Sequence, residues 1–247
     1  MRASIPQVLL PERSDEARTH LEVYFQNYRG KQKGYSGRVF DTLDHGASPA
    51  DSITAADLLA VSMLSVRISG TAAQQFLEDT DGIRTNVEAL LGQIDAKLSI
   101  TSAEGRDLLR RDHSVLSEVW DEMRRAQGFG PVVTSKLLAR KRPRLVPVFD
   151  NKVASALGLS GSKDHWTRMA DFFEPELSAD VYDERGLAGH LKDLWSSSIV
   201  PEGCAEKVSL LRVFDVIVWR ETKFPSLKPR EEGSNPSRLR AAPRSQR

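Results

Sequence analysis

The residues best suited to chemistry lie between Gly128 and Val153, in the stretch GFGPVVTSKLLARKRPRLVPVFDNKV. Gly128 and Gly130 stand one residue apart, directly before a segment of helical character that starts at Pro131. A glycine turn at the start of a helix leaves backbone N–H groups pointing outward, and the helix dipole favours negative charge there. Pro131 suits the first helical position, because its missing donor costs nothing at that point. The turn is therefore a candidate phosphate site.

A basic run follows this turn and leads to a carboxylate. The densest group of cations in the body of the chain is Lys136, Arg140, Lys141, Arg142 and Arg144. A solvated charged face is the usual reason for such a run, but beside a phosphate-binding turn a role in contacting a DNA backbone is equally open. Asp150 precedes a short helical segment that Gly158 ends, so Asp150 is predicted to cap that helix.

With Phe129 between its two glycines, the turn resembles the helix-hairpin-helix motif, which binds the DNA backbone without reading bases. From Ser114 to Gly158 the chain resembles the helix-hairpin-helix DNA glycosylase superfamily. Asp150 lies twenty residues beyond Gly130, as that family's catalytic Asp does, although one extra residue separates Val148 from Asp150.

The resemblance implies that a base is flipped into a pocket and that the Asp150 carboxylate stabilises an oxocarbenium-like sugar. Val132 stands where lyase-competent members carry Lys, so a monofunctional base-excision glycosylase is favoured over a lyase. Lys152, where His is frequent in that family, is a further departure from its pattern. Besides Asp150 as catalytic residue, the predicted DNA contacts are Gly128, Phe129, Gly130, Val132, Lys136, Arg140, Lys141 and Arg142.

Two alternatives stay open beside this hypothesis. A non-catalytic helical module would use the same turn to bind DNA or a protein partner, and a purely structural turn would only pack two helices. The whole chain also resembles a bacterial family of uncharacterised domains, through GFGPVVTSKLLARKRP and LLRVFD, and this resemblance implies no activity. Four aromatic residues are equally open as pocket residues: Tyr24, Tyr35, Trp166 and Trp195.

The elements that must position this stretch are predicted to be helical. Helical periodicity and capping signals favour helices at 14–29, 55–68, 71–78, 85–98, 102–111, 114–125, from 131 onward, 150–158, 166–173, 186–195 and 207–219. Only Leu145–Phe149 alternates as a strand would. Arg212 and Asp215, three residues apart in the last helix, are predicted to form a surface ion pair, with a polar pair facing a cleft as the alternative.

We therefore expect an all-α, multi-helix globular fold, DNA-glycosylase-like, with the helix-hairpin-helix at 114–140. A flexible N-terminus is predicted at 1–13, a single helical domain of one or two lobes at 14–222, and a disordered basic tail at 223–247.

The composition limits which partners, metal sites and disulfides the chain can have. The 247 residues carry 35 Lys or Arg and 34 Asp or Glu, so net charge gives no reason to expect a polyanionic partner over the whole surface. The single Cys204 excludes an intramolecular disulfide and Cys-rich metal sites, and the histidines have no metal-ligand spacing. We expect no metal, cofactor or membrane contact, a cytoplasmic location, and DNA as partner through its backbone; the oligomeric state stays open.

Overall fold

The computed structural model describes residues 5–26, 35–159, 163–198 and 207–225, and within these ranges it has twelve α-helices and no strand. The all-α prediction is confirmed. The alternating run Leu145–Phe149 is a turn and coil instead, and its apolar side chains are buried with no neighbouring strand to pair with. Among the described residues, no helix has the length and apolar character that a membrane crossing requires.

The helices follow the predicted order, with shifted ends. They are α1 (Ser14–Phe25), α2 (Ala55–Met63), α3 (Gly70–Glu78), α4 (Ile83–Leu91), α5 (Ala103–Arg110), α6 (Val115–Arg125), α7 (Pro131–Lys141), α8 (Asn151–Ala156), α9 (Lys163–Phe172), α10 (Pro175–Ser178), α11 (Gly186–Ser197) and α12 (Leu210–Lys223). Four short 3-10 helices add η1 (Gln7–Leu9), η2 (Pro11–Arg13), η3 (Ser36–Val39) and η4 (Leu43–Gly46).

Local capping explains several helix starts. The Thr54 side chain and Asp57 form the predicted capping box at α2. Ser69, Ser102, Ser114 and Ser209 each accept a backbone N–H of the first turn of α3, α5, α6 and α12. The end of α2 was predicted too late: the helix stops at Met63 rather than Ile68, since Ser65 takes a φ of 60° that no α-helix can continue through.

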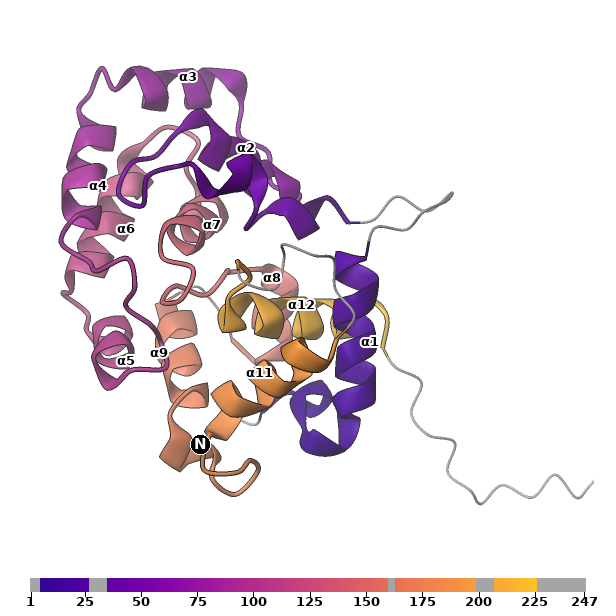
Figure 1. Ribbon diagram of the computed structural model, residues 1–247. Helices are drawn as coiled ribbons and strands as arrows, with labels where there is room; N and C mark the ends of the chain where they lie inside the picture. Colours follow the sequence, from indigo (N-terminus) through magenta and orange to yellow (C-terminus); the bar gives the residue numbers. More distant parts are fainter. Residues whose placement is uncertain (1–4, 27–34, 160–162, 199–206, 226–247) are drawn as a thin grey trace, which may run out of the picture.

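The helices form two groups, which the α7–α8 connector links (Figure 1). In the first group α7 packs against α2 and α6, while α3 and α4 complete the outer layer. In the second, α12 packs against α1, α8 and α11, so the start of the described chain lies beside its end. Consequently α7, α8 and α12 meet near the middle of the molecule.

The predicted termini are only partly described. Residues 5–13, expected to belong to a flexible N-terminus, instead form η1 and η2, because Val8 and Leu9 are buried in the core and Tyr182 Oη donates to the Leu9 carbonyl at 2.9 Å. The tail predicted as disordered lies outside the described residues from 226 onward, as does Cys204.

Candidate functional site

A cavity of about 370 Å³ lies where the two groups of helices meet, within the size range of small-molecule sites. Its wall is made by α1, the segment from Tyr35 to Gly37, the turn after α2, and parts of α7, α8 and α12. Three residues of the sequence-predicted site line it: Val132, Lys136 and Asp150. The glycine turn and the rest of the basic run lie elsewhere in the structure.

Asp150 lines this cavity from the N-terminus of α8. Its Oδ1 accepts the backbone N–H of Lys152 at 2.9 Å, which confirms the predicted cap. Ser135 of α7 holds the preceding connector, because its hydroxyl donates to the Pro147 carbonyl at 3.3 Å and accepts the Phe149 N–H at 2.9 Å. Within the described part of the chain Oδ2 of Asp150 has no hydrogen bond, so this oxygen is available to a ligand.

Arg212 and Asp215 line the cavity from α12 and are buried, so the surface ion pair expected from the sequence is wrong and the alternative of a polar pair at a cleft is right. The pair is buried because α12 packs against other helices on several sides. The Arg212 guanidinium bonds Asp215 Oδ2, the Tyr24 hydroxyl at 2.6 Å and the Gly37 carbonyl at 3.0 Å. Its Nε lies 3.4 Å from Asp41 Oδ2.

The electrostatics around Asp215 favour a retained proton. Burial, assisted by the charge of nearby Asp150, raises the pKa of Asp215 to about 6 against the opposing charge of Arg212. Oδ1 of Asp215 is buried and has no hydrogen-bond partner among the described residues. Burial likewise raises the pKa of Asp41, although Arg212 lies beside it.

Lys136 brings a buried cation to the same cavity. It is 2% exposed, and its Nζ donates to the Leu64 carbonyl at 3.0 Å, in the turn that ends α2. Burial lowers the pKa of Lys136, while the carboxylates of Asp150 and Asp215 act in the opposite direction. The amine therefore faces both carboxylates from α7.

One wall of the cavity is aromatic. The rings of Tyr24 and Tyr35 stack with centroids 5.1 Å apart and planes 8° from parallel, and Trp219 meets Tyr35 edge-on at 5.6 Å. Of the four aromatic candidates, Tyr24 and Tyr35 line the cavity. The other two pack elsewhere, Trp166 against Trp120 and Trp195 against Phe25.

Trp219 and Lys223 of α12 also line the cavity, and neither was predicted from the sequence as a site residue. A signal was present: Arg212, Asp215, Trp219 and Lys223 recur at intervals of three and four, and so mark one face of α12.

The basic run does not form the solvated face considered from the sequence, because only Arg144, after α7, is exposed and the other four cations have buried side chains. Arg140 bonds the Phe40 carbonyl at 2.6 Å and pairs with Asp44 and Asp57 at 2.9 and 3.3 Å. Lys141 pairs with Asp57 at 2.5 Å. Both cations therefore bond α7 to α2 and to the loop before α2. Neither has an exposed charged group that could make the DNA contact predicted from the sequence.

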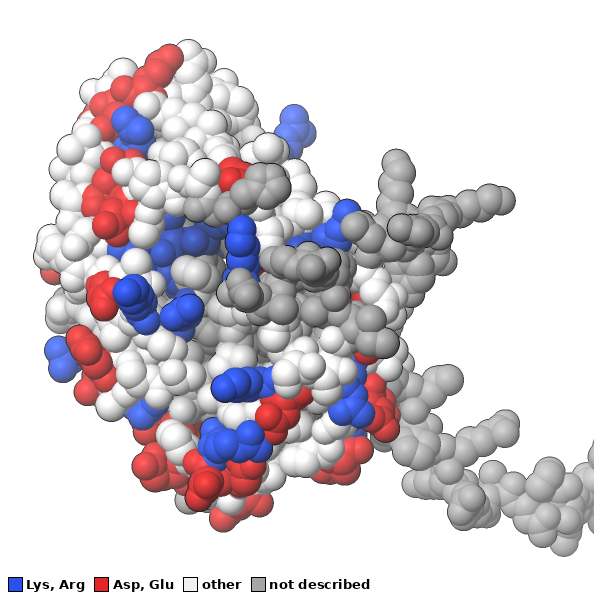
Figure 2. Space-filling view, in the orientation of Figure 1, with Lys and Arg blue, Asp and Glu red and all other residues white. Residues whose placement is uncertain are grey.

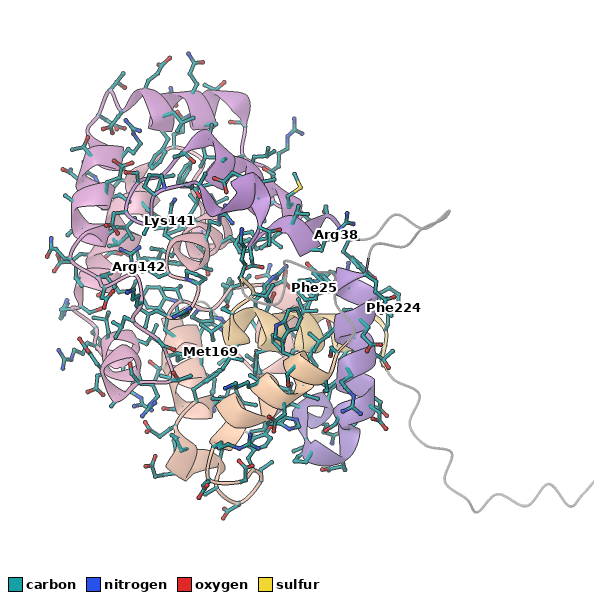
Figure 3. The ribbon with its side chains drawn as sticks, in the orientation of Figure 1. Phe25, Arg38, Lys141, Arg142, Met169 and Phe224 are labelled. Carbon is teal, nitrogen blue, oxygen red and sulfur yellow. The ribbon has the colours of Figure 1, made fainter. Side chains whose placement is uncertain are left out.

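Arg142 is also internal, at 0% exposure, and lies with Lys141 at the end of α7 (Figure 3). Its guanidinium donates to the carbonyls of Ala50 at 2.8 Å and Ile94 at 3.2 Å, and to that of Leu91. It thereby satisfies the carbonyl of the last residue of α4 and two loop carbonyls, a structural role that the sequence did not indicate.

The glycine turn has the local geometry that its residue types predict. Gly128 has a φ of 79°, Phe129 is buried with its ring 4.6 Å from that of Phe76, and Pro131 is the first residue of α7. No side chain caps α7 at Gly130. Arg124, an exposed residue of α6 that was not singled out from the sequence, donates from Nη1 to the Phe129 carbonyl at 2.9 Å.

On the face shown in Figure 2, Lys and Arg gather towards the middle while Asp and Glu gather along the outer edge. Among the residues lining the cavity, Lys136, Lys152, Arg212 and Lys223 outnumber Asp150 and Asp215. The nearly neutral chain thus has a locally positive cavity, which favours an anionic ligand. Within the described ranges no three His, Cys, Asp or Glu side chains come together as a metal site.

Fold and site together define an all-helical protein with a positively charged, aromatic-walled cavity that holds two carboxyl groups. The chain belongs to a family of unknown function (DUF6308), whose model matches residues 17–222. The cavity residues named above lie within that match, apart from Lys223. Neither the curated proteins nor the solved structures compared with the chain include a match.

Proposed function

We propose that this protein binds DNA through a helix-hairpin-helix and hydrolyses the N-glycosidic bond of a base flipped into the cavity. The observation that carries the proposal is the position of Asp150, whose carboxylate lines a cavity with an aromatic wall and keeps one oxygen without a hydrogen bond in the described structure. The proposed activity is monofunctional base excision.

The hairpin would be α6, the glycine turn and α7. The first-turn N–H groups of α7 have no intrahelical acceptor and no side-chain cap, so a DNA phosphate is a suitable ligand for them. Exposed Arg124 beside the turn supplies a cation for the same phosphate. In this proposal Arg140, Lys141 and Arg142 hold the hairpin in the fold rather than contact DNA.

The cavity residues divide the chemistry among them. Tyr24, Tyr35 and Trp219 offer ring faces and edges on which a flipped base packs. As the C1′–N bond breaks, positive charge develops on the sugar, and the Asp150 carboxylate stabilises that charge and orients a water towards C1′. The charge of Lys136 opposes the rise in the pKa of Asp215.

DNA binding is tested by titrating a fluorescent duplex at several salt concentrations. We expect the affinity to fall as salt rises, because bound phosphates release counterions. Arg124→Gln should weaken binding and reduce the salt dependence, whereas Arg111→Gln, also exposed but directly after α5, should do neither. Absence of measurable affinity, or affinity independent of salt, would remove the DNA-binding part of the proposal.

Base release is tested with wild type and Asp150→Asn on duplexes that each carry one damaged or mismatched base. Asn caps a helix as well as Asp does, so this substitution removes the charge and keeps the cap. Wild type should release at least one base and the variant should lose that activity while retaining DNA binding. If wild type binds DNA but releases nothing, the non-catalytic binding module is the correct function.

A further inference from the structure

The carboxyl group of Asp215 has no assigned role in the proposed hydrolysis, although it lines the same cavity as Asp150. The two groups lie in different settings. Asp150 is partly exposed at the start of α8, whereas Asp215 is 6% exposed within α12. Two carboxyl groups in unlike environments at one site are the usual arrangement for separate acid and base roles.

Beside Asp215, two buried carboxyl groups pair with a single arginine among the described residues. Arg212 is shared between Asp215 and Asp41, and both carboxyl groups are buried. Lys136 on α7 offsets one charge, but Asp150 adds another from α8. Tyr24 of α1 bonds Arg212 through its hydroxyl and adds no charge, since burial raises the pKa of that hydroxyl. A buried carboxyl group in such surroundings is stabilised by binding a proton.

The hydrogen bonds indicate where that proton sits. Oδ2 of Asp215 accepts from Arg212 Nη1, so a proton on Oδ2 would conflict with this donor. Oδ1 has no hydrogen-bond partner within the described residues. A proton on Oδ1 would therefore find its acceptor in a ligand that occupies the cavity.

We propose that Asp215 is the general acid of this site, donating its proton to the departing base, and that the substrates are consequently electrically neutral bases. This inference rests on the proposed glycosidic hydrolysis. A neutral base leaves as an anion unless it gains a proton, whereas a base that an alkyl group has already made cationic leaves as a neutral molecule without one.

The proposed step balances without any further reactant. The C1′–N bond breaks and its electron pair goes to the base, which takes the proton from Asp215. Water adds to C1′ and gives a proton to Asp150, which returns it to solvent, and Asp215 regains a proton from solvent. The products are the free base and the sugar hemiacetal.

The experiment compares single-turnover release of two kinds of base from otherwise identical duplexes. One duplex carries the neutral base that wild type releases fastest, and the other carries the cationic base 7-methylguanine. Rates are measured from pH 5 to pH 8 for wild type and for Asp215→Asn, and urea unfolding verifies that the variant is folded.

We expect Asp215→Asn to lower the ratio of neutral-base to cationic-base release about 100-fold or more, the range of general acid catalysis. Wild-type release of the neutral base should fall as pH rises, and this dependence should be absent from the variant. The titration of Asp215 is coupled to the charges of Arg212, Lys136 and Asp150, and through Arg212 to Asp41 and Tyr24.

Each other outcome has a distinct meaning. Equal losses on both bases, or the same pH profile in variant and wild type, would overturn the role of Asp215. Release of 7-methylguanine alone would overturn the substrate class but keep the hydrolysis. If wild type releases no base at all, the proposed function fails and the inference fails with it.

Discussion

Two buried charge clusters in this protein use the same residue types and differ in how completely they are satisfied. The closed cluster consists of Asp57, Arg140 and Lys141, between α2 and α7. The cavity cluster consists of Asp41, Arg212 and Asp215, beside the cavity. Asp57 pairs with two cations, one of which also pairs with Asp44, whereas Asp41 and Asp215 share the single Arg212.

The hydrogen bonds follow the same division. Asp57 accepts from Ser48 at 2.7 Å and from the Thr54 N–H at 2.9 Å, besides its two cations. Burial alone would raise the pKa of Asp57, but these donors outweigh it and lower the pKa, whereas the pKa of Asp215 is raised. Complete pairing indicates a structural role, and incomplete pairing at a cavity indicates a group kept ready for a ligand.

The largest expected difference between the clusters is in stability. Asp57→Asn should lower the free energy of unfolding by about 3–5 kcal/mol, because it leaves Arg140 and Lys141 buried with too little negative charge. Asp215→Asn should cost less than about 1 kcal/mol at pH 7, since Arg212 keeps Asp41, Tyr24 and Gly37. Urea unfolding measures both, and equal costs would remove the distinction between the clusters.

The pH dependence of stability should have opposite signs in the two clusters. The raised pKa of Asp215 contributes stability that is complete below its ordinary value of 3.8 and is lost as pH rises through about 6. The lowered pKa of Asp57 contributes stability that is present above 3.8 and is lost as pH falls.

Between pH 4 and pH 7, wild type should therefore lose about 2–3 kcal/mol of unfolding free energy relative to Asp215→Asn. Urea unfolding at four pH values in this window measures the difference. A difference that stays constant with pH would mean that Asp215 titrates in the fold as it does in the unfolded chain.

A smaller loss of stability is expected when a methyl group is added next to the cavity cluster. Gly37→Ala would place a methyl group 2.1 Å from the Tyr24 hydroxyl and 3.3 Å from Arg212 Nη2, and we expect a loss of about 1–3 kcal/mol. Gly70→Ala is the control, because a methyl group at that position meets no atom within 4 Å. Thermal unfolding of the two variants decides, and equal melting temperatures would show that the cluster tolerates displacement.

The smallest expected effect concerns the glycine turn. Gly130 has a φ of −73°, which any residue adopts, and an added methyl group would lie 3.7 Å from Arg124 Nη1. Gly130→Ala should therefore change stability by less than about 1 kcal/mol but weaken DNA binding about tenfold, because a methyl group on the turn hinders approach of a phosphate. Unchanged affinity in a duplex titration would argue against a phosphate at this turn.

Local rules explain which parts of the structure were predictable from the sequence. Pro131 at the start of α7, the capping box at Thr54 and the Asp150 cap each depend on residues within a few positions of one another. The all-α fold follows from the same signals repeated along the chain. Helix ends were less predictable: α4 stops at Leu91 although its apolar pattern continues to Leu98.

The roles of the charged residues depend on partners that are far away in the sequence, so they could not be predicted from neighbouring residues. Arg140 pairs with Asp44 and Asp57, which lie more than eighty positions earlier in the chain, so the basic run looked exposed. Arg212 and Asp215 looked like a surface pair because nothing nearby in sequence indicates Tyr24 or Gly37. Their position among the apolar residues of Leu210–Val218 was the available signal that they face something polar.

The central claim is that the Asp150 carboxylate stabilises positive charge on a sugar in the cavity, and an abasic analogue tests it without knowledge of the base. Duplexes carrying a cationic pyrrolidine or a neutral tetrahydrofuran in place of one nucleoside are compared for affinity. Wild type should bind the cationic analogue about 100-fold more tightly or better, as expected for a transition-state mimic, and Asp150→Asn should lose this preference without losing affinity for the neutral analogue. Equal binding of the two analogues by wild type would contradict the claim.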